Sequence, residues 1–397
     1  MTENKFEFII ELGSNKFRGL SFSKESNAKE IYIEKNNNIL INSNIKNFND
    51  VNNLLKNFIL DLEKESKEYI SNINLMIDSS EMKSINFSIF KKMDGESIKE
   101  KDIIFLIRDA KQRLIQNQPH LSIAHIVIAK FVVDNQDYSD QPIDIVCDKF
   151  SIELNFICFP KNLIKNLENL FHSNTINIDR ILCSSYARSL NASKINYNSG
   201  KVCFVDIGFE KISILQFFNE NLIEINSLPI ASNHITKDIS KICHLSIEES
   251  ENIKKDLKIQ KKLTNNNLDK QNLEINFFKD TNFKDISYSL LKDVIYSRLD
   301  EIIGLIIKNI FEQKNLENKD VMIFFMGNGS KIFQNNLANI EKISLRAKSI
   351  QFLNEKGLEI CKSGLKLIKG TYKLEAVAVP KKLEKTGFFE KLFHLFR

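Results

Sequence analysis

Hydrophobic positions recur at two periods along the chain, which predicts a protein that mixes helices with strands. Apolar residues three and four apart are typical of amphipathic helices, whereas short, dense apolar runs are typical of buried strands. Ser97 with Glu100, and Ser246 with Glu249, have the form of capping boxes, so we expect a helix to begin at each. We also expect helices over residues 49–69, 162–172, 283–312 and 331–340, and strands over 73–77, 125–133 and 150–159.

The segment Thr386–Arg397 has the most complete separation of apolar from polar positions. At about 100° per residue, its apolar side chains fall within an arc of roughly 160° on a helix. They are Phe388, Phe389, Leu392, Phe393, Leu395 and Phe396. A helix this short needs an apolar surface to fold against, so we expect these residues to bind an anionic membrane surface, helped by Lys381, Lys382 and Lys385. The alternative is a helix docked on the protein's own core.

Two segments far apart in the chain resemble each other, FIIELGSNKFRGLSF at 8–22 and CFVDIGFEKISILQF at 203–217. Aligned without gaps, they share an apolar strand, an acidic residue, a glycine, a lysine and a second strand-like run. The shared positions are Glu11 and Asp206, Gly13 and Gly208, and Lys16 and Lys211. This repeat predicts two related α/β lobes, each opened by a β-hairpin, which face each other across a cleft.

The turns of these hairpins suggest a phosphate site. A glycine turn lets backbone N–H groups converge on an anion, and a carboxylate at the strand end can orient a hydrated divalent cation. A third loop, Gly327–Ser330, follows an apolar strand and precedes a predicted helix, whose N-terminus favours negative charge. Two facing turns and this loop would hold a polyphosphate, and Lys16 could supply a positive charge to it.

Composition narrows the class of protein. A chain of 397 residues exceeds one hydrophobic core, so we expect two or more domains. The 56 basic and 51 acidic residues are dispersed, so nucleic acid is not an expected partner. No apolar run is long enough to span a membrane and the N-terminus lacks the pattern of a signal peptide. The 6 cysteines have no Cys-x-x-Cys spacing, which is typical of reduced core thiols, and His234 has no partner at metal-ligand spacing, so we assign no metal.

Four stretches resemble the actin, Hsp70 and sugar kinase superfamily, and more narrowly the FtsA family of bacterial actin homologues. They are ELGSNKFRGL at 11–20, FVVDNQDYSDQPID at 131–144, NHITKDI at 233–239, and the amphipathic terminus. The resemblance implies an actin-like (ribonuclease H-like) α/β fold of two duplicated lobes, with an inserted FtsA-type (SHS2-like) subdomain and a C-terminal amphipathic helix. The implied division is 1–78 with 160–185, the insert at 79–159, 186–235 with 320–379, 236–319, a linker at 380–386, and the helix at 387–397.

The resemblance also implies a site for ATP with Mg²⁺. The residues that it assigns to the nucleotide are Glu11, Gly13, Ser14, Asn15, Lys16, Asp206, Gly208, Arg298, Glu301, Gly327, Asn328, Gly329 and Ser330; it assigns no catalytic residue. Arg298 and Glu301 are explained equally well by a surface ion pair. Phe209 and Glu210 stand where the family has small residues, and Glu210 would bring negative charge towards the phosphates. We therefore expect slow or absent ATP hydrolysis.

Three functional hypotheses follow. The resemblance to the FtsA family implies a polymer-forming adaptor on the cytoplasmic face of the inner membrane, at the division site, which binds the C-terminal tail of the tubulin-like FtsZ and recruits other division proteins. A phosphotransferase or exopolyphosphatase-like enzyme is a second hypothesis, because Glu11–Arg18 also resembles the opening hairpin of exopolyphosphatases. A third is a protein like PilM of the type IV pilus machinery, which shares the fold.

Overall fold

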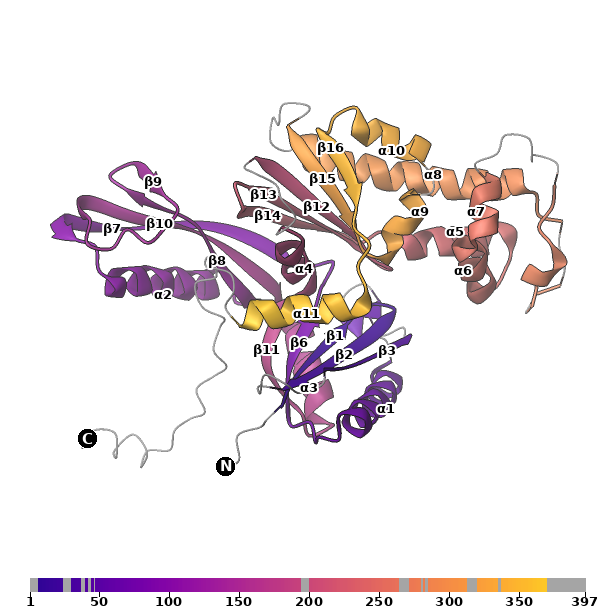
Figure 1. Cartoon of the computed structure of the whole chain (residues 1–397), viewed down its shortest axis with the longest axis horizontal. Coiled ribbons are helices and arrows are strands. Elements are labelled where there is room, and N and C mark those ends of the chain that lie inside the picture. Colours follow the sequence, from indigo (N-terminus) through magenta and orange to yellow (C-terminus); the bar gives the residue numbers. More distant parts are fainter. Residues whose placement is uncertain are drawn as a thin grey trace.

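The computed structural model describes residues 6–23, 30–36, 40–41, 44–45, 47–193, 200–263, 271–279, 281–282, 285–312, 320–334 and 337–369. The predicted linker and amphipathic terminal helix lie outside the described residues. The chain forms two stacked lobes, each built on a sheet, with a third unit projecting to one side (Figure 1).

The first lobe is built on a five-stranded sheet with the order β11-β6-β1-β2-β3. Its strands are β1 (Phe6–Leu12), β2 (Lys16–Ser23), β3 (Ile31–Asn36), β6 (Asn72–Ile77) and β11 (Asn177–Cys183). β1 to β3 are antiparallel neighbours, whereas β6 and β11 run parallel to β1. The central strand β1 is buried from Phe8 to Leu12 on both faces, which is why Phe8, Ile9 and Ile10 are apolar in succession rather than alternating with polar residues.

The second lobe repeats this topology in a sheet with the order β14-β13-β12-β15-β16. Its strands are β12 (Lys201–Ile207), β13 (Ile212–Phe218), β14 (Asn221–Leu228), β15 (Val321–Met326) and β16 (Ser349–Phe352). β12 to β14 are antiparallel, and β15 and β16 are parallel to β12. The duplicated α/β architecture that the two similar segments predict is therefore confirmed, with one hairpin opening each sheet.

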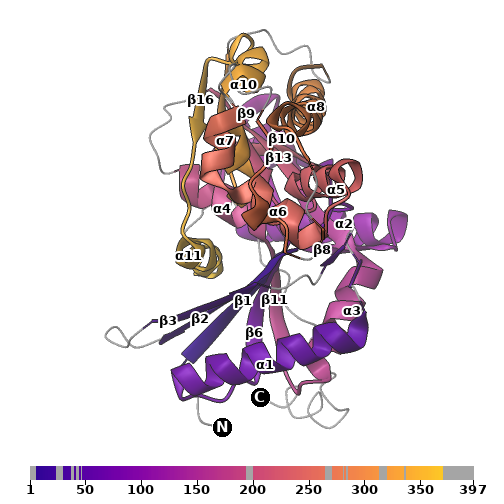
Figure 2. The ribbon, with the colours of Figure 1, turned by 90° about the vertical axis from the view of Figure 1, so that its right-hand side faces the viewer.

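Helices cover the first sheet on its outer face (Figure 2). They are α1 (Phe48–Ser66) and α3 (Lys161–His172), and a short pair of strands, β4 (Leu40–Ile41) and β5 (Asn44–Ile45), precedes α1. The apolar positions of α1 that the sequence spaces at helical period, Val51, Leu55, Phe58, Ile59 and Leu62, are all buried. Each such side chain contributes about 1.5–3 kcal/mol on burial, so packing rather than intrinsic propensity stabilises this helix.

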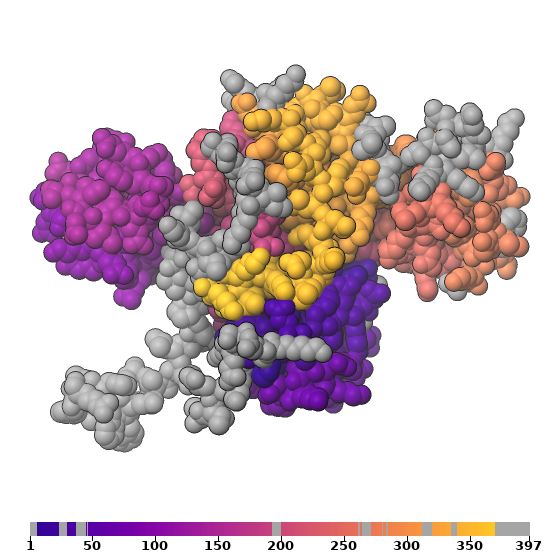
Figure 3. Space-filling model, in the orientation of Figure 1, coloured from indigo at the N-terminus to yellow at the C-terminus, as the bar shows by residue number. Residues whose placement is uncertain are grey.

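The projecting unit contains a four-stranded sheet and one helix with a hydrophobic core of their own. Its elements are β7 (Lys83–Ser97), α2 (Glu100–Asn117), β8 (Leu121–Val133), β9 (Gln136–Tyr138) and β10 (Val146–Pro160), with the strand order β7-β10-β8-β9. In the space-filling view it stands apart from the body as a separate globule (Figure 3). Its base is tied to the first lobe by buried His125, whose Nε2 accepts a hydrogen bond of 2.8 Å from the backbone N–H of Cys183.

The predicted capping box at Ser97 and Glu100 is wrong. Ser97 is the last residue of β7, and the helix begins at Glu100 with Lys99 as its N-cap. The Asp102 carboxylate accepts the Lys99 backbone N–H at 2.9 Å and the Lys91 ammonium at 2.6 Å. This second contact, from a neighbouring strand, adds to the stability of the later starting point.

Helices of the second lobe gather at the opposite side from the projecting unit (Figure 1). They are α5 (Ser232–Cys243), α6 (Ile247–Lys255), α7 (Leu257–Leu263), α8 (Tyr288–Ile307) with a wider turn over Lys308–Glu312, and α10 (Leu337–Ser344), and a short turn of helix covers Ile275–Phe277. The predicted capping box at Ser246 is confirmed: Ser246 Oγ accepts the Glu249 N–H at 3.1 Å, and Glu249 Oε2 accepts the Ser246 N–H at 2.9 Å.

Two helices lie between the lobes and connect them. They are α4 (Ser184–Ser193), which leaves β11, and α11 (Gly357–Ile368), which returns from the second lobe to lie across the first sheet (Figures 1 and 2). One hydrophobic core continues through this junction, from Phe8 of β1 to Tyr186 of α4, Phe204 of β12 and Cys361 of α11. Among the described helices, none is both long and apolar enough to cross a membrane.

Candidate functional site

A cavity of about 700 Å³ lies between the lobes where the two hairpin turns approach each other. The predicted site residues that line it are Glu11, Gly13, Ser14, Asn15 and Lys16 of the first turn, Asp206 and Gly208 of the second, and Gly327, Asn328, Gly329 and Ser330 of the third loop. These residues come from three distant segments of the chain. The fold thus brings together the three loops that the sequence singles out.

The two hairpin turns have the same closing hydrogen bond. The Gly13 N–H donates to the Lys16 carbonyl at 2.9 Å, and the Gly208 N–H donates to the Lys211 carbonyl at 3.0 Å. Each carboxylate that precedes the turn, Glu11 or Asp206, is buried at the end of its central strand. The internal repeat therefore extends from topology to local turn geometry.

The glycines of the third loop allow it to pack closely against the second hairpin. Gly327 has a φ of 85°, and a Cβ there would lie 2.3 Å from Asp206 Oδ1 and 2.5 Å from the Ile207 carbonyl oxygen. A Cβ at Gly329 would lie 2.5 Å from the Gly208 carbonyl oxygen. The loop, with a helical turn over Asn328–Ser330 that leads into α9 (Lys331–Gln334), packs directly against the second hairpin. Its glycines are needed for this approach whether or not a ligand is present.

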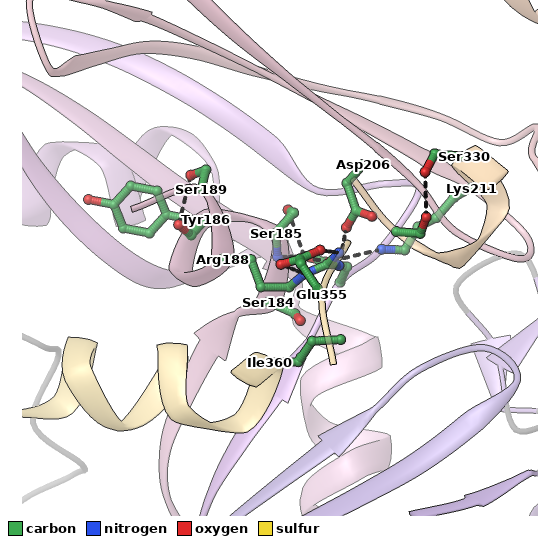
Figure 4. Close-up of polar contacts among 12 residues, drawn as sticks. Ser184, Ser185, Tyr186, Arg188, Ser189, Asp206, Lys211, Ser330, Glu355 and Ile360 are labelled. Atoms are coloured by element: carbon green, nitrogen blue, oxygen red, sulfur yellow. Dashed lines mark hydrogen bonds and ion pairs between the residues drawn. The ribbon is translucent and has the colours of Figure 1, made fainter. Parts of the chain in front are cut away.

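Arg188 of α4 lines the cavity and points toward Asp206 and Glu355 (Figure 4). Its Nη1 lies 2.6 Å from Asp206 Oδ2, its Nε lies 3.1 Å from Glu355 Oε1, and its Nη2 contacts the other Glu355 oxygen. The side chain is only 7% exposed. Burial opposes its charge, yet the two carboxylates raise the pKa of Arg188 well above its usual value, so the guanidinium stays charged.

The pKa values of the two carboxylates that bind Arg188 shift in opposite directions. Burial raises the pKa of Asp206 to about 6, although Arg188 acts to lower it. Burial also acts to raise the pKa of Glu355, but Arg188 outweighs it and the pKa of Glu355 is lowered. Asp206 Oδ1 is buried without a hydrogen-bond partner among the described residues. It is the oxygen that faces Gly327.

A second ion pair joins the two lobes. Lys211 of the second hairpin lies 3.4 Å from Asp78, which follows β6 of the first lobe. Asp78 also accepts hydrogen bonds from the backbone N–H of Ser185 at 3.1 Å and from its hydroxyl at 3.0 Å. The start of α4 is therefore held by the same carboxylate that meets the opposite lobe.

The first hairpin carries its own charge cluster. Arg18 pairs with buried Glu11, and its Nε donates to Glu34 Oε2 of β3 at 2.9 Å. Glu34 also binds the Lys16 ammonium and the Tyr32 hydroxyl. Burial acts to raise the pKa of Glu34, but hydrogen bonds from Lys16, Tyr32 and Arg18 lower it to about 2. Lys16, predicted to serve phosphates, thus has a protein partner.

Comparison with known proteins identifies the family. The family model described as "Cell division protein FtsA" matches residues 203–375, and the model described as "SHS2 domain inserted in FTSA" matches residues 79–158. The chain belongs to the FtsA family. The second match covers the projecting unit, so that unit is the SHS2 insertion, and the predicted fold class is confirmed for the described residues.

Individual relatives are distant. The FtsA protein of Buchnera aphidicola subsp. Schizaphis graminum is 25% identical over 276 residues, which cover 68% of this chain and 64% of that protein. The FtsA of Buchnera aphidicola subsp. Acyrthosiphon pisum is 25% identical over 320 residues, which cover 76% of this chain and 73% of that protein. The solved PilM-PilN type IV pilus biogenesis complex has a TM-score of 0.58 at 12% identity and 89% coverage of both chains, which shows a shared fold.

Glu210 of this FtsA-family chain does not face the cavity, contrary to the expectation from its sequence position. Its carboxylate is buried, with Oε1 accepting from Asn233 Nδ2 at 2.5 Å and Oε2 lying 3.5 Å from the Lys237 ammonium. Both partners belong to α5, which packs behind the hairpin. Phe209 does line the cavity, and its ring centroid is 5.5 Å from Lys254 Nζ.

Several lining residues from α6 and α7 were not anticipated. They are Glu251, Lys254, Lys255, Leu257 and Gln260. Lys254 is buried, and its ammonium lies 2.6 Å from Glu251 Oε2, 2.8 Å from Thr236 Oγ1 and 3.0 Å from the Ser232 carbonyl. Burial lowers the pKa of Lys254, against the raising effect of Glu251. A Glu-x-x-Lys-Lys run directly after a capping box was the available signal.

Arg298 and Glu301 are not brought to the cavity. They lie one turn apart on α8, where Arg298 pairs with Glu301 and also with Asp238 of α5, at 2.6 Å from Nε to Oδ2. Both residues therefore form surface ion pairs, which was the alternative to contact with the nucleotide. His234 accepts the Ala231 N–H at 3.2 Å and so stabilises the start of α5. Within the described ranges, no group of three or more His, Cys, Asp or Glu side chains is arranged to hold a metal.

Proposed function

We propose that this chain is an actin-like adaptor for cell division, which tethers FtsZ to the cytoplasmic face of the inner membrane at the division site. Membership of the FtsA family is the observation that carries this proposal. The amphipathic segment 387–397, with its polar linker, supplies the membrane contact in this proposal. One short helix binds a membrane weakly, so polymerisation of the chain strengthens attachment through multivalency.

The partners in this proposal are the FtsZ C-terminal tail, other division proteins and further copies of the same chain. The smaller subdomain of the second lobe, 236–319, receives the tail, and the insert at 79–159 contacts neighbouring protomers or later division proteins. These boundaries and contacts are predictions from the family resemblance. The separate hydrophobic core of the insert supports its role as a distinct binding module.

In our proposal, the cavity between the lobes binds an adenine nucleotide. Its volume lies within the range of small-ligand sites, and two glycine turns and the loop Gly327–Ser330 converge on it. Lys331, at the start of α9, lines the cavity and has no ion-pair partner among the described residues. Gly13–Lys16, Gly208 and Gly327–Ser330 would hold the phosphates of ATP. Bound ATP would favour lobe closure and polymerisation, with slow or no hydrolysis.

Liposome flotation with anionic vesicles and ATP tests the adaptor function. We expect the full chain to float with the vesicles and to carry FtsZ with it, while a chain ending at Pro380 stays in solution. Replacing Phe389 and Phe393 together by Asp should abolish flotation because it places charge on the apolar face. Replacing Glu390 and Lys391 together by Gln is the matched control and should preserve it.

Two outcomes would contradict the proposal. If the full chain and the shortened chain both stay in solution, the segment is not a membrane anchor. If the full chain floats but leaves FtsZ in solution, membrane binding stands and the tethering function does not.

A further inference from the structure

The acidic residues at the ends of the two central strands face arginines. In an ATP site that uses Mg²⁺, such carboxylates orient the hydrated cation beside the phosphates. Here Glu11 is paired with Arg18 and Asp206 with Arg188. We propose that Arg18 and Arg188 take the place of the divalent cation, so that the cleft binds a nucleoside polyphosphate as the metal-free anion. This inference rests on the proposed nucleotide site.

The first pair is enclosed. The side chains of Glu11 and Arg18 are each 8% exposed, and the remaining Glu11 oxygen lies 3.5 Å from the Ser184 hydroxyl. Arg18 is also held by Glu34 through its Nε. A metal approaching Glu11 would have to displace a guanidinium that is fixed by two carboxylates.

The second pair is equally closed to a cation. Asp206 Oδ2 lies 2.6 Å from Arg188 Nη1, and Arg188 is anchored at its other edge by Glu355. Asp206 Oδ1 is free of partners among the described residues, but it is shielded from solvent and faces the backbone at Gly327. A hydrated cation could reach this oxygen only if the third loop moved away.

The charge of the site supports the same conclusion. Two guanidinium groups carry the same charge as one divalent cation, and in a site shielded from water that charge attracts phosphate oxygens more strongly than it would in solvent. Both arginines line the cavity, so a polyphosphate bound there would lie beside their positive charges while the carboxylates hold the side chains in place. Lys331 adds a further cation to the lining of the cavity.

Calorimetric titration of the full chain with ATP, in excess EDTA and in excess Mg²⁺, tests the inference. We expect the two dissociation constants to agree within about threefold. A dissociation constant that rises about tenfold or more when EDTA replaces Mg²⁺ would overturn it while leaving the proposed ATP site intact. If ATP binds in neither condition, the nucleotide part of the proposed function fails, and this inference fails with it.

Arg188→Gln provides a second arm. It leaves Asp206 and Glu355 without a cation, so metal-free ATP should bind about tenfold more weakly than to the unaltered chain, and Mg²⁺ should restore part of the affinity. Equal binding of metal-free ATP by this variant and the unaltered chain would contradict the role of Arg188. Arg113→Gln, which removes an exposed arginine paired with Asp109 on α2, is the control and should change neither constant. Thermal unfolding checks that each variant is folded. If Arg188→Gln does not fold, the comparison of EDTA with Mg²⁺ on the unaltered chain still tests the inference.

Discussion

Arg188 Nη1 lies 2.6 Å from Asp206 Oδ2, which joins the crossing helix α4 to the strand that opens the second lobe. The same guanidinium binds Glu355, so three segments of the chain meet at one buried cation. Buried ion pairs contribute little net stability compared with apolar packing, but removing one partner leaves an uncompensated charge. Arg188 therefore links α4 to two acidic residues of the second lobe that line the cleft.

Arg188→Gln should therefore lower the free energy of unfolding by about 3–5 kcal/mol, because Asp206 and Glu355 lose their buried partner. Urea denaturation measures the change. Arg113→Gln removes a pair on the surface of α2 and should have little measurable effect. Equal losses of unfolding free energy for the two variants would show that the buried ion pairs matter no more to stability than the exposed pair on α2.

Gly327→Ala should destabilise the protein by about 2–3 kcal/mol, because alanine disfavours a positive φ and its Cβ would overlap Asp206 Oδ1. Gly304→Ala is the matched control. Gly304 is exposed within α8 and a Cβ there meets nothing within 4 Å, so alanine should stabilise the helix by about 0.5–1 kcal/mol. Thermal unfolding should thus shift in opposite directions for the two variants, and a shift in the same direction would refute this explanation.

Glu249→Ala should cost about 2–4 kcal/mol of unfolding free energy. The Glu249 carboxylate closes the capping box of α6 and also accepts the backbone N–H groups of Lys279 at 2.8 Å and Thr281 at 3.0 Å. Its removal leaves three donors without their partner. Glu248→Ala, at the exposed neighbouring position, should cost much less in the same urea titration, and comparable costs would argue against the capping role.

Glu34 should make stability depend on pH. Its pKa is lowered to about 2 in the folded protein from an ordinary value of 4.5, so its stabilising contribution is present above pH 4.5 and is lost as the pH falls towards 2. Glu34→Gln removes this contribution. The difference in unfolding free energy between the unaltered chain and the variant should be largest near neutral pH and should shrink steadily in acid. A difference that stays constant from neutral pH to pH 3 would contradict the lowered pKa.

Local features of the site could be predicted because they depend on neighbours in sequence. The turns at Gly13 and Gly208 follow from a strand, a glycine and a second strand, and the capping box at Ser246 follows from a glutamate three residues later. The capping box predicted at Ser97 failed because Asp102 caps the helix instead: it accepts the Lys99 N–H, and its contact with Lys91 of β7 favours the same later start.

The sequence by itself determined the duplicated α/β lobes and the three loops that meet at the cleft, because apolar periodicity and turn residues specify local structure wherever they occur. The inserted unit was implied by the resemblance to the FtsA family. Only the tertiary structure decided which charges meet. Arg188 and Glu355 are 167 residues apart in sequence, and Glu210 turns away from the cavity to reach α5. Electrostatic partners depend on distances in space. Glu11 and Arg18 lie opposite each other across the first hairpin, but the pairing of Asp206 with Arg188 joins separate elements, so it emerged only from the folded chain.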